Sequence, residues 1–499
     1  MNHVSPQRRM RRNLVCASAA GVLFAAACWP FAATFVAMPP SDDLILLNHR
    51  AAELHAEGRY ADAITPGLQA TAITEQLFEP FSPLLARTLD SLAMEYLATG
   101  RYAEAEPLYL RALAIRETSL QPNDPEFGSS LNNLAVLYQK TGRLDEAVRF
   151  NSRALDITQR ALGQAHPAVG KILANLSLLL QLHGRHADAV AVAERAMTVL
   201  TGAMGDNHPD LCTLLDTLGY AYLSLKRTDE AESTFLRALS IRQRAHQPTH
   251  PDLAVSHNNL SFLYLKQGRY ADAEPHSVKV VAFVELNSSA QSQQFDAALA
   301  NLATVRAMQG RLGEAEQLYN RSLSKREKIL GSEHADLAVT LENLAMVYQL
   351  QKRYSEAKSA YLRALSINEA KRGAQHPAVG TTLINLATLN FNQGNLAEAE
   401  QLAHRALQVL EGSAKTSPKV QAEALDVLGH ILAASGRVSE AVRARRRSRL
   451  IKQNMQAELK QTAMAGALKV GAFVAAPQIG AGRNSIDHQP LQASGLVSE

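Results

Sequence analysis

The chain has little cysteine, few aromatic residues and no strong excess of either charge. Its three cysteines, Cys16, Cys28 and Cys212, are too few and too far apart for a disulfide framework or a cysteine-based zinc site. Aromatic residues make up 5% of the 499 residues, and the net charge of +4 is too small and too scattered to indicate nucleic-acid binding. A hydrophobic content of 46% is nevertheless ample for a folded core. The composition therefore excludes a disulfide-rich domain and a disordered chain.

Motifs typical of catalysis are also missing. The chain contains no glycine-rich phosphate loop, no HExxH metalloprotease motif and no GxSxG nucleophile elbow. We therefore expect a protein without enzymatic activity, without a cofactor and without a small-molecule substrate.

Acidic residues are absent ahead of Asp42. Four arginines between positions 8 and 12 precede an uncharged, largely apolar stretch that starts at Leu14 and ends at Ala37, longer than the about 20 helical residues that span a bilayer. A basic stretch before an apolar one is typical of targeting segments. The sequence predicts a signal or anchor over residues 1–40, either an uncleaved membrane tether or a cleaved signal. The remainder would then be exported, at the periplasmic face of the inner membrane or secreted; a mitochondrial presequence is the alternative.

One phrase of the sequence occurs twice. NNLAVLYQKTGRLDEA occupies residues 132–147, and NNLSFLYLKQGRYADA occupies residues 258–273, a shift of three times 42 residues. At every step of 42 residues an acid is followed by an alanine, and four residues before the acid stands a glycine or, in two units, Lys226 or Lys352. The unbroken phase predicts ten units over residues 41–457. The ten alanines are Ala63, Ala105, Ala147, Ala189, Ala231, Ala273, Ala315, Ala357, Ala399 and Ala441.

Each unit has the pattern of two helices. Leu134 and Tyr138 lie on one helical face, and Gly142 can take the left-handed conformation that ends a helix. The recurring alanine is expected where the two helices cross closely. Lys226 and Lys352 would be strained in the left-handed conformation, so their turns are predicted to be weaker or differently shaped.

This arrangement resembles the tetratricopeptide repeat. The 42-residue length, together with NNLA at 132–135, GRYAEAE at 100–106 and LRALAIRE at 110–117, resembles more closely the repeats of kinesin light chain. The resemblance implies an all-α fold, a right-handed superhelical solenoid of about ten helix pairs, whose first helices line a concave groove for peptides. It implies a non-catalytic scaffold or adaptor with protein or peptide partners. A periplasmic factor that handles a polymer or carbohydrate and an intracellular or mitochondrial adaptor are the alternatives.

The resemblance also indicates which residues would contact a ligand. An asparagine just before the stripe leucine would face the groove, where its amide can pair with both the N–H and the C=O of an extended peptide. Three residues after this position, Tyr220 and Phe262 would contribute to an apolar floor, with Lys140 and Lys266 on the walls. A structural bond to the neighbouring helix is the alternative for the asparagines, and inter-helix packing for the stripe. The asparagines are Asn133, Asn175, Asn259, Asn301, Asn343 and Asn385.

Histidine recurs in the turns between units. Equivalent atoms in successive units are at least about 8–10 Å apart, too far to share a metal whose bonds are about 2 Å long. We therefore expect these histidines to cap turns and expect no metal site among them. The five are His166, His208, His250, His334 and His376.

The last unit departs from the pattern. Its second helix is rich in arginine, which predicts a polar cap for the array, with docking to an acidic surface or partner as the alternative. Residues 458–499 have lost the repeat and are predicted to be a low-complexity, disordered tail.

Overall fold

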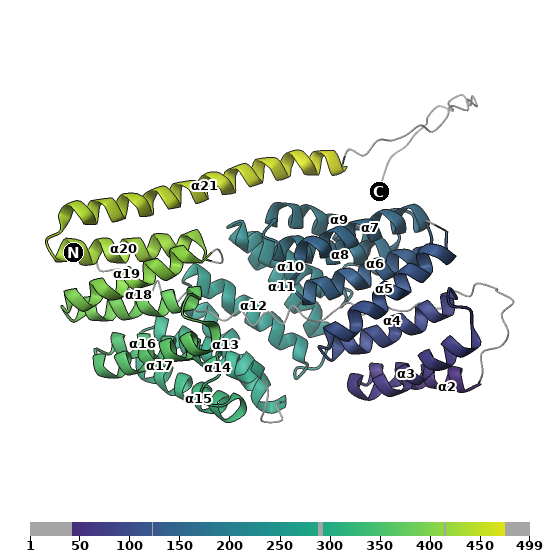
Figure 1. Cartoon of the computed structure of the whole chain (residues 1–499), viewed down its shortest axis with the longest axis horizontal. Helices are drawn as coiled ribbons and strands as arrows, with labels where there is room; N and C mark the ends of the chain where they lie inside the picture. The colour runs from purple at the N-terminus through teal and green to yellow at the C-terminus, as the bar shows by residue number, and fades with distance from the viewer. Residues whose placement is uncertain (1–41, 122, 288–292, 414–415, 475–499) are drawn as a thin grey trace, which may run out of the picture.

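Helices account for nearly all of the chain that the structure describes. The computed structural model describes residues 42–121, 123–287, 293–413 and 416–474, which contain twenty helices in ten consecutive pairs (Figure 1). The first helices of the pairs are α2 (Asp42–Ala56), α4 (Pro83–Ala98), α6 (Pro125–Lys140), α8 (Pro167–Leu182), α10 (Leu211–Ser224), α12 (Pro251–Gln267), α14 (Gln293–Met308), α16 (Leu337–Leu350), α18 (Pro377–Asn392) and α20 (Pro418–Ala434). The second helices are α3 (Tyr60–Leu77), α5 (Tyr102–Ser119), α7 (Leu144–Leu162), α9 (His186–Met204), α11 (Thr228–Ala245), α13 (Tyr270–Asn287), α15 (Leu312–Leu330), α17 (Tyr354–Arg372), α19 (Leu396–Gly412) and α21 (Val438–Val474).

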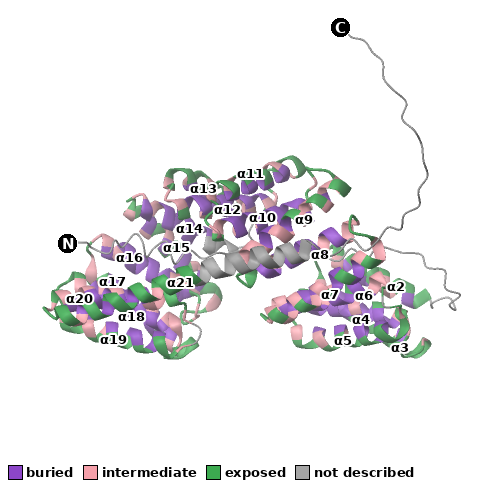
Figure 2. Cartoon of the chain, turned by 90° about the horizontal axis from the view of Figure 1, so that it is seen from above, coloured by how far each residue is buried: buried purple, intermediate pink, exposed green. Residues whose placement is uncertain are grey.

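The pairs stack side by side along the chain. Each first helix packs on the second helix of its own pair and, from α4 onward, on the second helix of the preceding pair. Figure 2 shows these pairs along an arc, with α11 and α13 on its outer side and α10 and α12 on its inner side. The predicted all-α solenoid of ten helix pairs is therefore confirmed.

The recurring alanine lies in the core of every unit. Nine of the ten alanines have no exposed surface, and Ala441 is 2% exposed. The hydroxyl of Ser177 in α8 donates a hydrogen bond of 2.9 Å to the carbonyl oxygen of Ala189 in α9. Such a bond brings the side chain of one helix onto the backbone of the other, so a larger side chain than alanine would separate them.

The turns within the pairs share one geometry, whichever residue they contain. Gly142 has φ of +77°, and the next N–H, that of Arg143, donates to the Tyr138 carbonyl at 2.8 Å. Lys226 and Lys352 both have φ of +62°, and Arg227 N–H makes the equivalent bond to Tyr222 at 2.9 Å. The lysine turns are therefore not differently shaped. Their remaining predicted property is a lower stability.

Lys226→Gly is accordingly expected to stabilise the chain. Glycine adopts the left-handed conformation without a Cβ penalty, which for other residues is about 1 kcal/mol or more. We expect the free energy of unfolding in urea to rise by about 1 kcal/mol. Lys226→Ala is the control, because alanine removes the ammonium group but keeps the Cβ; an equal gain from both variants would contradict the argument.

The recurring histidines cap the turns between units, and three of them, His166, His250 and His376, are the N-cap residues of the helices that follow. In all five, Nδ1 accepts a hydrogen bond from the backbone N–H two residues later, at 3.1 to 3.3 Å. Asp124 makes the same bond through its carboxylate at 2.8 Å. The predicted capping role is confirmed.

One core position departs from the rest of the array. His257 of α12 is buried, and its Nδ1 lies 2.8 Å from Nδ1 of His276 in α13. One ring must donate and the other accept, so two fully protonated rings would place donors face to face. Burial, with smaller contributions from His276 and Lys279, lowers the pKa of His257 to about 4, and burial also lowers that of His276. The other nine units carry leucine here, at Leu47, Leu89, Leu131, Leu173, Leu215, Leu299, Leu341, Leu383 and Leu425.

Acid is expected to destabilise this unit. The pKa of His257 in the folded chain lies below its ordinary value of 6.5, so protons bind the unfolded chain more tightly. The free energy of unfolding is therefore unaffected by protonation of this histidine above pH 6.5 and falls as the pH is lowered toward 4. The expected decrease at pH 5 is about 2 kcal/mol. Urea unfolding of the wild type and of His257→Leu/His276→Leu at pH 7.5 and 5 measures it. An equal loss in both proteins would contradict the assignment.

The last helix extends beyond the predicted repeat domain. α21 continues past residue 457 to Val474 and contacts α9, so it returns toward the first half of the array (Figure 1). The predicted signal or anchor at residues 1–40, with the tether from Leu14 to Ala37, and residues 475–499 of the predicted tail lie outside the described residues. Within the described ranges, the structure has no helix long and apolar enough to cross a membrane.

Candidate functional site

All six predicted asparagines are on the first helices of their pairs. Asn133 and Asn175 are partly exposed, and the other four are buried. The Nδ2 groups of three of them donate to the preceding first helix: Asn175 to Asn132 at 2.9 Å, Asn259 to Asp216 at 2.9 Å, and Asn301 to Asn258 at 3.1 Å. The structural bond considered as the alternative is thus present at three positions. Contact of these amides with a ligand stays a prediction.

Four of the predicted residues come together on α10 and α12. The Tyr220 hydroxyl donates to Oδ1 of Asn259 at 2.7 Å, and the rings of Tyr220 and Phe262 lie 6.1 Å apart between centroids. Nζ of Lys266 lies 5.1 Å from the centroid of the Phe262 ring. Tyr220 and Phe262 are partly exposed and Lys266 is exposed. We call Tyr220, Phe262 and Lys266 the central face.

Lys140 does not belong to the central face. It ends α6, three units before Lys266 at the same position of the repeat, and is partly exposed. Leu182 occupies this position at the end of α8 and is 45% exposed. The sequence analysis did not identify Leu182, although the 42-residue step from Lys140 leads directly to it.

A buried ionic network is connected to the central face through Asn259. The Asp216 carboxylate accepts from Asn259 and, at 2.6 Å, from Nη2 of Arg242, whose Nη1 donates to Ser256 at 2.7 Å. Burial raises the pKa of Asp216, and the charge of Arg242 opposes this. The network connects α10, α11 and α12 and fixes the amide to which Tyr220 bonds.

Sequence reasoning missed this network, although the sequence contains a signal for it. Asp90, Arg116 and Ser130 precede Asp216, Arg242 and Ser256 by the same 126 residues that separate the duplicated phrases. Arg116 pairs with Asp90 and bonds Ser130 in the same way. A polar triad at buried helical positions, repeated in phase, therefore indicates a shared ion pair.

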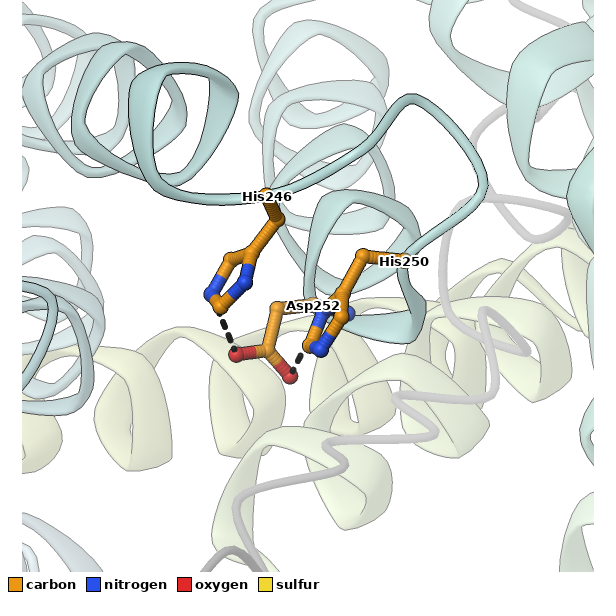
Figure 3. Close-up of side chains that lie close together, drawn as sticks. All are labelled: His246, His250 and Asp252. Carbon is orange, nitrogen blue, oxygen red and sulfur yellow. Dashed lines mark hydrogen bonds and ion pairs between the residues drawn. The ribbon is translucent and has the colours of Figure 1, made fainter.

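One turn gathers residues that could hold a metal ion. His246, His250 and Asp252, between α11 and α12, place their ligand atoms within 4.8 Å of one another (Figure 3). The prediction that the histidines bind no metal was based only on histidines at equivalent positions of successive units. That prediction did not include His246, which follows directly after α11 and belongs to the same turn as His250.

Two solved structures of similar fold have TM-scores above 0.5 with this chain. The apo form of RapI is 14% identical and has a TM-score of 0.54, with 74% of this chain and 98% of that chain covered. The apo form of the quorum sensor NprR from B. thuringiensis is 12% identical at a TM-score of 0.54, with coverages of 74% and 97%. A putative kinesin light chain from Podospora anserina with nearly identical repeats is 23% identical, with coverages of 41% and 97% and a TM-score of 0.36. No curated protein matches the chain.

Likeness at these identities shows the fold alone, whereas the family model matches the sequence itself. The model of the tetratricopeptide repeat matches residues 42–118, 126–202, 210–285, 295–370 and 336–412, which together cover well over half of the chain. With ten stacked helix pairs and this match, the chain belongs to the tetratricopeptide repeat family.

Proposed function

We propose that this protein is a non-catalytic scaffold that binds an extended segment of a partner protein across the central face. The observation that carries the proposal is the partly exposed pair of rings, Tyr220 and Phe262, beside the exposed ammonium group of Lys266. These residues come from α10 and α12, on the inner side of the arc in Figure 2. A segment that crosses several inner helices would contact several units at once.

The chemistry of the central face favours a particular ligand. Aromatic rings contribute a large apolar contact area with few rotatable bonds, and the positive charge of the exposed Lys266 favours an acidic group beside them. An extended segment with an apolar or aromatic anchor next to a carboxylate fits both. The buried Asn259 would act mainly by orienting Tyr220, since its two amide ends already bond to Asp216 and Tyr220.

Photo-crosslinking tests the proposal. A photoreactive phenylalanine analogue at Phe262 is expected to capture a protein partner from cells, identified by mass spectrometry. The same analogue at Leu236, an exposed residue of the outer helix α11, is the control and is expected to capture much less. Equal capture at both sites would contradict binding at the central face.

The crosslinked species also discriminates between classes of function. Neighbouring aromatic rings are also suited to binding carbohydrate. Capture of glycans through position 262 would therefore favour a factor that handles a polymer or carbohydrate. The identified partner then permits a second measurement, in which Phe262→Ala is expected to weaken binding at least about tenfold, as for a buried aromatic anchor.

Export with a membrane tether is part of the proposal. It rests on the basic and apolar pattern of residues 1–40. Protease is added to cells whose outer membrane has been permeabilised and whose inner membrane is intact. It is expected to degrade the repeats and to leave a cytoplasmic control protein uncut. Protection of the repeats would favour an intracellular adaptor instead.

A further inference from the structure

We propose that the turn between α11 and α12 binds a divalent transition-metal ion, with zinc as the first candidate, through His246, His250 and Asp252. The three side chains come from one short segment, His246 directly after α11 and Asp252 in the first turn of α12 (Figure 3). Two imidazoles and one carboxylate form a ligand set that suits zinc and its neighbours, whereas calcium and magnesium prefer oxygen ligands alone.

The distances between the ligand atoms support coordination. Nε2 of His246 lies 3.6 Å from Oδ2 of Asp252, and Nδ1 of His250 lies 3.9 Å from Oδ1 of the same carboxylate. Both distances are too long for hydrogen bonds. Two ligands of one tetrahedral zinc ion are about 3.3 Å apart, because each bond is about 2.0–2.2 Å long. Small movements of the side chains would therefore bring all three onto one ion.

The two rings are already gathered on one side of the turn. The imidazoles of His246 and His250 are stacked, with centroids 3.7 Å apart and planes inclined by 7°. Coordination requires the rings to tilt, so that their lone pairs meet, and this rotation about χ2 is soft in histidine. The side chains are between 23% and 38% exposed, which leaves an entry path and room for water as a further ligand.

The capping bond of His250 would be exchanged for a coordination bond. Nδ1 of His250 accepts from the Asp252 N–H at 3.3 Å, through the lone pair that faces the carboxylate. A metal ion at Nδ1 would take over this lone pair and would join the segment after α11 to the first turn of α12 more firmly than the single hydrogen bond.

Other units of the array provide the comparison that makes His246 notable. His208 with Asp210, and His334 with Asp336, repeat the pair formed by His250 and Asp252. At the position of His246, however, those units carry Met204 and Leu330. Within the described residues, the turn that contains His246 is the only place where three potential metal ligands of histidine, cysteine or acidic residues come within 4.8 Å of one another.

Metal titration of the untagged, metal-free chain tests the proposal. Calorimetry with Zn²⁺ is expected to give one saturable site, and Co²⁺ is expected to give the visible absorption of a nitrogen-coordinated ion that Zn²⁺ abolishes. His246→Leu is expected to weaken Zn²⁺ binding at least tenfold, because the loss of a mere second-shell partner already has an effect of about 10- to 100-fold. Leucine suits this position, as Leu330 shows, so the variant should retain the wild-type helicity and urea midpoint in chelator.

Two further variants make the outcome decisive. Asp252→Asn keeps the size of the side chain and the capping N–H, and it is expected to weaken Zn²⁺ binding at least tenfold as well. His208→Ala changes the equivalent cap one unit earlier and is expected to leave the affinity unchanged. No saturable binding, or the same affinity in His246→Leu and Asp252→Asn as in the wild type, would overturn the proposal.

Discussion

Ala273→Trp is expected to divide the array at its sixth unit. Ala273 has no exposed surface and lies in the first turn of α13, where the equivalent alanine of another unit contacts the facing helix through its backbone. An indole at this position has no room, and overpacking a core by far less costs about 1–3 kcal/mol. We expect the free energy of unfolding to fall by at least about 3 kcal/mol. Urea unfolding followed by circular dichroism should then change from one transition to two, because each unit is stabilised by its neighbours.

Ala271→Trp is the matched control for this substitution. Ala271 lies in the same turn of α13 but is exposed, so the same indole would project into solvent. Its free energy of unfolding is expected to remain within about 0.5 kcal/mol of that of the wild type, with a single transition. Similar curves for Ala271→Trp and Ala273→Trp would mean that the close approach of the helices is not needed at this point.

Arg242→Ala is the second substitution with a large expected effect. The guanidinium is buried between α10, α11 and α12, and its removal leaves the Asp216 carboxylate without its cation. Breaking a buried ion pair from one side costs about 3–5 kcal/mol. We expect a loss of this size in the free energy of unfolding. Because Asp216 also fixes Asn259, faster hydrogen exchange is expected in α10 and α12.

Two other variants test whether the loss comes from the unpaired charge of Asp216. Arg244→Ala removes an exposed arginine two residues later on α11 and is expected to have little effect. The double variant Asp216→Asn/Arg242→Met removes both charges and should recover a large part of the loss, since no buried charge then lacks a partner. Equal stability of Arg242→Ala and Arg244→Ala would show that the ion pair contributes nothing.

The sequence predicted the fold because the fold is built from local signals that recur. Gly142 ends a helix and Ala147 packs at a crossing by rules that need no knowledge of the remainder of the chain, and both rules are repeated with a constant step. The histidine caps followed from the same logic, because capping involves residues only two positions apart. Ten repetitions of a weak local signal are together a strong one.

The candidate site was predictable only in part, because its properties depend on contacts between units. The stripe placed Tyr220 and Phe262 on one face, as the structure shows, but the partner of Asn259 lies 43 residues away on another helix. The pairing of His257 with His276 depends on the packing of α12 on α13. His246 escaped notice because its neighbours belong to the same turn, whereas the comparison followed the repeat.

The return of α21 to α9 limits how this protein can change in evolution. A simple row of equal modules can be lengthened or shortened by recombination, since each module contacts only its neighbours. Here the final helix lands on a particular earlier one. One module fewer or one more between α9 and α21 would bring the last helix to a different neighbour, so the number of modules after α9 is tied to this contact.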